Sequence, residues 1–142
     1  RMVILHVNYE ELTALRSGAR VFLDRADAGE GFVLAPCEEK SRVEALLPQL
    51  EGDLSLSTLH DLRAVQSAVG AIVECLQAEM EVAVVTTHAA DEDAVAAYFD
   101  FAHGLTVARR VDEMAAEMEA LIELVTGAPA TDETSRSFLF PD

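Results

Sequence analysis

The most regular pattern in this chain is a run of apolar residues spaced by three and four positions across 91–126. The residues that repeat at this spacing are Val107, Val111, Met114, Met118, Leu121 and Val125. They fall on one face of a helix, and acidic side chains fall on the opposite face. Three acids from Asp91 to Asp93 favour a helix start, and Gly127 with Pro129 favours an end. The sequence therefore predicts one long helix over 91–126.

The first half of this helix is apolar on a second face, roughly opposite to the first. The residues on the second face are Tyr98, Phe101, Ala102 and Leu105. A helix that is apolar on two sides needs cover from two directions. At ~1.5 Å per residue the helix is roughly 50 Å long, which exceeds the roughly 35–40 Å diameter of a compact domain of this size. We therefore expect the helix either to project and pair with another chain, or to bend at His103 and Gly104.

A second helix with the same spacing precedes the long one. Its repeating residues are Leu62, Val65, Val69, Ile72, Leu76 and Met80. Ser57 is the predicted N-cap, with Thr58 and Ser55 as alternatives. The segment 81–87 is rich in β-branched residues and would suit a strand, but the helical spacing continues through it. We therefore extend the helix to about Thr87.

The helices at about 57–87 and 91–126 together predict an antiparallel hairpin joined by a short turn. Near the turn, both arms carry apolar residues that lie off the packed faces. These residues are Val82, Val85, Tyr98 and Phe101. We expect them to be covered by the N-terminal part of the chain or by the same region of a second subunit.

A smaller unit of strand, helix and strand precedes the hairpin. The run Met2–Val7 reads as a buried strand. Asn8 followed by Glu11 is a variant capping box, which predicts a helix over Tyr9–Ala26. A second short strand is expected over Gly31–Pro36, where it pairs with the first.

A short helix over 37–50, interrupted near Pro48, connects this unit to the hairpin. After the hairpin, residues 128–142 form a polar linker with an apolar end. The apolar residues at this end are Phe138, Leu139 and Phe140. We expect this tail to dock on its own domain or on a sister subunit, or else to present a short motif to another protein. The predicted fold is mainly α, a long antiparallel helical hairpin with a small N-terminal strand–helix–strand unit, and residues 1–127 form a single helical domain.

The net charge of −16 on 142 residues changes which partners this domain suits. Because phosphate repels an acidic surface, we expect no binding to nucleic acid or to an anionic membrane. A basic protein or a divalent cation is compatible with the charge. No run approaches the ~20 apolar residues of a membrane span, and the two cysteines form no CxxC motif. We therefore expect a reduced, cytoplasmic protein, and the Ala-rich composition with one lysine is typical of a GC-rich bacterial genome.

One polar cluster inside the predicted hairpin is a candidate metal site. Asp100 and His103 are three residues apart and share a helix face, and the antiparallel register places Glu79 level with Asp100. Inward carboxylates and histidines of helical bundles hold di-iron and related centres, which normally use two Glu-x-x-His pairs and two further glutamates. One Asp-x-x-His is therefore incomplete within a single chain, and a second subunit would have to complete it. The alternative that we favour is a buried polar pair that fixes the register of the helices.

The sequence contains no GxSxG, HExxH, P-loop or GxGxxG motif. The leading prediction is a non-enzymatic, acidic helical interaction or assembly protein that self-associates through its long helices. Its predicted partner-binding residues are Tyr98, Phe101, Val82, Val85, Phe138, Leu139 and Phe140. The alternative is a metal enzyme that holds a divalent ion with Glu79, Asp100 and His103. A weaker alternative is an acidic protein that binds a basic protein or mimics DNA.

Overall fold

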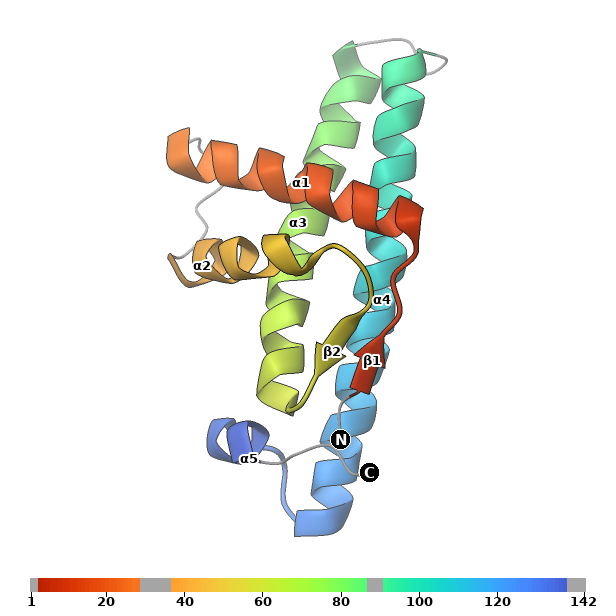
Figure 1. Ribbon diagram of the computed structural model, residues 1–142. Coiled ribbons are helices and arrows are strands. Elements are labelled where there is room, and N and C mark those ends of the chain that lie inside the picture. Colours follow the sequence, from red (N-terminus) through yellow and green to blue (C-terminus); the bar gives the residue numbers. More distant parts are fainter. Residues whose placement is uncertain (1–2, 29–36, 87–90, 138–142) are drawn as a thin grey trace.

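The structure of this protein is a computed structural model that describes residues 3–28, 37–86 and 91–137. Two long helices, α3 (Leu59–Thr86) and α4 (Glu92–Thr126), run antiparallel side by side and form the hairpin that the sequence predicts (Figure 1). The mainly α fold class is therefore confirmed. None of the described helices is both long enough and apolar enough to cross a membrane.

The ends of the two hairpin helices follow from local chemistry. The Asp91 carboxylate accepts a hydrogen bond from the backbone N–H of Asp93 and caps α4. Gly127 ends α4 in the left-handed conformation, with φ 74°, which costs a glycine little. At the start of α3 the N-cap is Thr58 rather than the predicted Ser57, because the Thr58 hydroxyl accepts from the backbone N–H of Asp61 at 3.1 Å.

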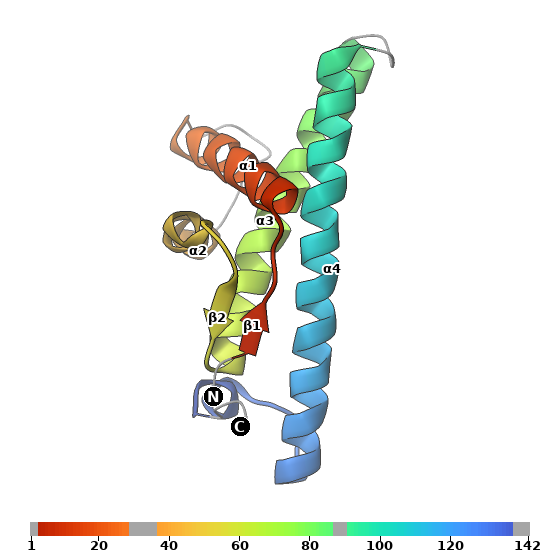
Figure 2. The same cartoon turned by 45° about the vertical axis from the view of Figure 1, so that its right-hand side comes forward.

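α3 remains helical through Thr86, so the helical interpretation of the β-branched segment is confirmed over the described residues. α4 continues through Gly104 as a single helix without a sharp bend (Figure 2), so the alternative of a bend at His103 and Gly104 does not occur. Gly104 instead allows close packing, because a Cβ there would lie 2.9 Å from Leu76 Cδ1 of α3. The long helix therefore projects.

The packed face of α3 is the one that the spacing predicts, from Leu62 to Leu76. On α4 the prediction holds at Val107 and Val111 but is wrong at Val125, which is 63% exposed. Near that end, Ile122 is buried instead. A pattern of threes and fours drifts by about 20° per seven residues around a straight helix, so the buried face rotates away from the extrapolated one.

The predicted capping box at the start of α1 (Tyr9–Ala28) is confirmed. The backbone N–H of Glu11 donates to Asn8 Oδ1 at 2.8 Å, and the backbone N–H of Asn8 donates to Glu11 Oε1 at 3.0 Å. α1 lies across the middle of the hairpin and packs against both α3 and α4 (Figure 1). Gly18 permits this close crossing, because a Cβ at this position would lie 2.7 Å from Ile72 Cγ2.

The sheet differs from the predicted one. β1 (Val3–Leu5) pairs antiparallel with β2 (Leu54–Leu56), with Ile4 opposite Ser55. The predicted partner strand over 31–36 lies outside the described residues. β2 was not predicted because its alternation of apolar and polar residues, Leu54-Ser55-Leu56, is too short to indicate a strand.

The remaining described elements, α2 (Cys37–Leu46) and α5 (Asp132–Ser137), pack against α3. α2 continues into a short 3-10 helix, η1 (Leu47–Gln49), so the predicted interruption near Pro48 is confirmed. The predicted linker contains the short helix α5, which packs beside the start of α3. The apolar end of the tail, 138–142, lies outside the described residues. The largest fully buried side chains of the resulting core include Leu5, Leu15, Leu50, Leu59, Leu62, Ile72 and Ile122.

Candidate functional site

The end of the hairpin farthest from α5 exposes a set of large apolar side chains, which we call the tip patch. Its members, between 40% and 85% exposed, are Val82, Val84, Val85, Val95, Tyr98 and Phe99. Val82, Val85 and Tyr98 are among the predicted partner-binding residues. Phe101, also among them, is half-buried and packs against the core, whereas the neighbouring Phe99 is exposed.

The tip patch is exposed because of where α1 crosses the hairpin. α1 contacts α3 at Leu76, opposite Gly18, and contacts α4 at Thr106 and Arg110 through Glu11, below the tip in Figure 1. Beyond this crossing, α3 and α4 cover only their shared face, where Ala94 is buried. Helices that are apolar on several sides are normally buried in a larger assembly. Within the described part of the chain, Phe99 shares a hollow with Tyr9 and Thr13 of α1, yet all six side chains of the tip patch stay at least 40% exposed.

The part of the hairpin that carries the tip patch contains aspartate and glutamate but neither lysine nor arginine. The sequence from 64 to 108 contains no lysine or arginine. Its acidic residues are Glu74, Glu79, Glu81, Asp91, Glu92, Asp93 and Asp100. Arg25, which comes from α1, forms an ion pair with Glu79. The tip patch is therefore an apolar surface with acidic neighbours.

The structure brings the predicted metal ligands partly together. Glu79 and Asp100 line the same hollow, of about 200 Å³, between α1, α3 and α4. His103 lines a second hollow with Asp100 and Phe99, and its ring stacks on Phe99 with 6.4 Å between ring centroids.

Burial raises the pKa of Asp100, and His103 opposes that rise. In the described ranges, no three His, Cys, Asp or Glu residues are grouped so that they could hold a metal ion. Because Glu79 already pairs with Arg25, a metal site at this level of the hairpin needs ligands from a second chain. That site stays a prediction, which metal analysis of protein purified without chelator tests.

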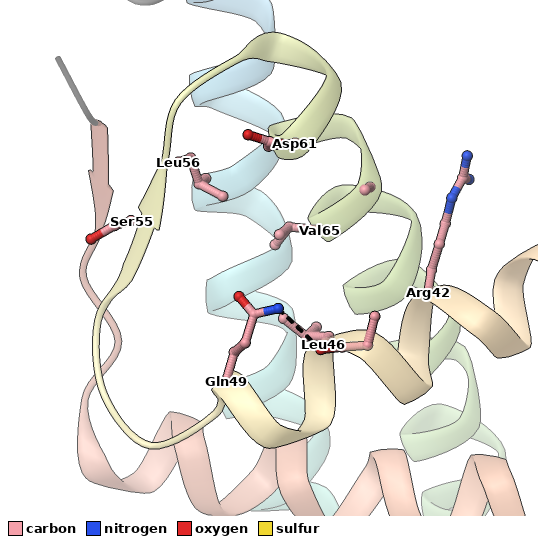
Figure 3. A pocket seen from close by; sticks show the side chains of 9 residues that line it. Arg42, Leu46, Gln49, Ser55, Leu56, Asp61 and Val65 are labelled. Atoms are coloured by element: carbon pink, nitrogen blue, oxygen red, sulfur yellow. Dashed lines mark hydrogen bonds between the residues drawn. The ribbon is translucent and has the colours of Figure 1, made fainter. Parts of the chain in front are cut away.

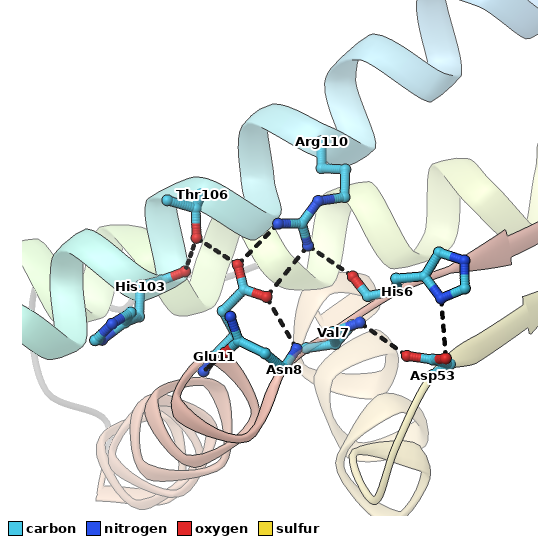
Figure 4. A network of polar contacts seen from close by, with 8 residues as sticks. All are labelled: His6, Val7, Asn8, Glu11, Asp53, His103, Thr106 and Arg110. Atoms are coloured by element: carbon cyan, nitrogen blue, oxygen red, sulfur yellow. Dashed lines mark hydrogen bonds and ion pairs between the residues drawn. The ribbon is translucent and has the colours of Figure 1, made fainter.

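A second polar cluster, which the sequence revealed only as a helix cap, joins α1 to α4 (Figure 4). Glu11 is only 2% exposed, and its Oε2 accepts from Arg110 at 3.0 Å and from the Thr106 hydroxyl at 2.5 Å. Its Oε1 accepts from the backbone N–H of Asn8 and from Arg110. Arg110 also donates to the backbone carbonyl of His6 at 2.6 Å.

These contacts set the charge state of Glu11. Burial works against ionisation, but the hydrogen bonds from Arg110, Asn8 and Thr106 outweigh it and hold the pKa of Glu11 below its ordinary value. The carboxyl group is therefore ionised, and both of its oxygens accept hydrogen bonds within the fold. The cluster has a structural role, because neither oxygen is left to act on a substrate.

The neighbouring Asp53 makes a similar structural link between the two strands. Its carboxylate accepts from the backbone N–H of Val7 at 2.9 Å and lies 3.0 Å from His6 Nδ1 (Figure 4). The Val7 N–H, followed by His6, lowers the pKa of Asp53. The link holds the turn before β2 against the end of β1.

A groove of about 330 Å³ lies between α2, η1, β2 and α3 (Figure 3). Its walls include the apolar side chains of Leu46, Leu56 and Val65. The Gln49 amide donates to the backbone carbonyl of Ala45, and Arg42 donates to Ser67 outside the groove. These two polar groups are therefore used within the fold.

Cys75 gives no support to thiol chemistry. It is buried, and burial raises the pKa of its thiol, which disfavours the nucleophilic thiolate.

Comparison of the chain with protein-family models, with curated proteins and with solved structures finds no match. Of the surfaces described above, the tip patch is the one whose composition the fold itself does not explain.

Proposed function

We propose that this protein is a non-enzymatic interaction protein that self-associates through its tip patch. The observation that carries the proposal is the exposure of six large apolar side chains on a projecting pair of helices. Contiguous apolar patches above a few hundred Å² mark interaction sites on soluble proteins. The partner is a second copy of this chain.

The size of the patch supports a partner of this kind. With ~150–250 Å² for each aromatic side chain and somewhat less for each valine, its exposed apolar surface is on the order of 600 Å². A standard interface buries about 800 Å² on each partner, including a polar rim. A contact that uses one side of each tip therefore buries part of this surface, which supports a modest dimer that dissociates on dilution.

The shape of the tip also favours pairing between copies. Each tip is a two-helix unit, and two such units packed against each other make a four-helix arrangement with an apolar centre. A two-fold axis places the same patch on both sides of the contact. Val85 and Phe99, each at least half exposed in the single chain, are buried in such a contact.

The test compares two matched substitutions at opposite ends of the hairpin. Val85 and Leu124 are 85% and 83% exposed, and each is replaced by aspartate. The molar mass is measured by light scattering after size-exclusion chromatography across a dilution series, and circular dichroism checks the helical content. We expect the wild type and Leu124→Asp to form dimers or larger species that dissociate on dilution, and Val85→Asp to be monomeric because it buries an unpaired charge. A wild type that stays monomeric at high concentration contradicts the proposal, as does equal disruption by Leu124→Asp.

A second candidate function is binding of a basic protein. It is favoured by the absence of lysine and arginine from 64–108. Attraction between an acidic surface and a basic partner weakens as salt rises. A complex whose affinity falls with added salt, in protein that does not self-associate, supports this candidate over the first.

A further inference from the structure

We infer that self-association through the tip patch is controlled by ionic strength and tightens as the salt concentration rises. The inference rests on the proposed function and adds how the same surface is regulated. It follows from the charges that lie beside the patch.

The charged neighbours of the tip patch on both helices are acidic. Glu81 shares a helix face with Val84 and Val85 on α3, and Glu92 shares one with Val95 on α4, because they are three or four residues apart. Asp93, in the same first turn of α4, lines the hollow that also contains Glu79 and Asp100. All three acidic side chains are exposed, and no salt bridge is found for them among the described residues. Pairing of two tips therefore brings two sets of carboxylates together with the apolar centre.

The two contributions to this contact respond differently to salt. Repulsion between exposed charges is screened over a Debye length of ~30 Å at 0.01 M salt, ~10 Å at 0.1 M and ~3 Å at 1 M. Across a helical interface the carboxylates of two tips are separated by distances in this range. Burial of the apolar centre does not depend on screening and is, if anything, strengthened by salt. Low salt therefore separates the copies, and high salt lets the apolar contact form.

A complex with a basic partner and a complex between two copies of this chain respond to added salt in opposite directions. A basic partner is attracted to the tip, so screening weakens that complex. Two identical acidic tips repel each other, so screening strengthens theirs. The sign of the salt dependence thus identifies what the tip patch binds.

The experiment measures the dissociation constant by sedimentation velocity at about 0.05 M and about 0.5 M sodium chloride. The wild type is compared with a tip variant, Glu81→Gln, Glu92→Gln and Asp93→Asn. A distal variant, Glu113→Gln, Glu117→Gln and Glu123→Gln, removes the same charge from exposed positions far along α4. Because the two variants have equal net charge, the comparison separates repulsion at the tip from the effect of the whole molecule's charge.

We expect the wild-type dissociation constant to fall about tenfold or more between the two salt concentrations. The tip variant should associate tightly at low salt and lose most of the salt dependence, whereas the distal variant should keep it. Association of the wild type that ignores salt or weakens with it overturns the inference while leaving the proposed function in place. Equal responses of the two variants also overturn it. Absence of association at every salt concentration removes the proposed function and this inference with it.

Discussion

Glu11 shows how one side chain fixes the position of a whole helix. Its carboxylate completes the N-terminal cap of α1 and at the same time binds Thr106 and Arg110 of α4. The crossing of α1 over the hairpin is therefore held by directional bonds as well as by apolar packing. This crossing decides how much of the hairpin stays uncovered.

We expect Glu11→Ala to lower the free energy of unfolding by about 2 kcal/mol, because it removes a cap and leaves Arg110 partly buried without its carboxylate. Urea denaturation followed by circular dichroism measures the change. Glu10→Ala is the matched control, since Glu10 is exposed in the same turn, and its effect should stay below about 0.5 kcal/mol. Equal effects of the two substitutions would show that the contacts of Glu11 with α4 add nothing.

The lowered pKa of Glu11 makes part of the stability depend on pH. A carboxyl whose pKa is lower in the folded state stabilises the fold above its unfolded pKa, and this contribution disappears as the pH falls through the folded pKa. We therefore expect the stability difference between wild type and Glu11→Gln to be largest near neutral pH and to shrink below about pH 4.5. Urea titrations between pH 7 and acid measure this difference, and a difference that grows in acid would contradict the assignment.

At the scale of the elements, glycines determine how closely three helices approach. A Cβ on Gly18 would lie 2.7 Å from Ile72 Cγ2 and 2.8 Å from Leu76 Cγ, whereas a Cβ on Gly70 would meet no atom within 4 Å. Both residues lie inside helices, so alanine increases helix propensity equally at the two positions. The two alanine substitutions therefore differ only in the atoms that the added methyl group meets.

We expect Gly70→Ala to stabilise the protein by up to about 1 kcal/mol through helix propensity. Gly18→Ala should destabilise it by about 1–3 kcal/mol, because the added methyl group forces α1 away from α3. Thermal unfolding of the two variants beside the wild type measures both changes. A stabilising Gly18→Ala would mean that α1 does not cross the hairpin as closely as described.

The sequence predicted the long elements but missed the short elements β2 and α5 for a physical reason. α3 and α4 repeat their apolar spacing over many turns, and the caps of α4 at Asp91 and Gly127 agree with that spacing. β2 and α5 span three and six residues, so their formation depends on tertiary contacts such as the bond from Arg63 to the buried Ser135. The exposed Val125 shows that a spacing rule loses accuracy when it is extrapolated along a straight helix.

At the scale of the whole molecule, the sequence predicted an apolar surface near the tip of the hairpin but not which of its residues are exposed. Apolar residues on two faces of both helices indicate a surface that needs cover. Which of them stay exposed depends on where α1 crosses, and local spacing carries no information about that crossing. For this reason Phe99 replaces Phe101 in the exposed set.

The charge of the molecule and the tip patch then act together. In the proposed assembly, the net charge of −16 keeps copies apart in dilute salt, and the tip patch is the apolar surface through which they would associate when charge is screened. The projecting length of the hairpin carries that surface away from the body of the protein (Figure 2).

Amide hydrogen exchange of the wild type, compared at low and high protein concentration, tests this account most directly because it locates the contact without a substitution. We expect exchange to slow at high concentration in the described tip segments, 82–86 and 92–99, and to stay unchanged around Leu124 and in α1. Exchange that does not depend on concentration, or that slows at the opposite end of α4, would contradict self-association through the tip patch.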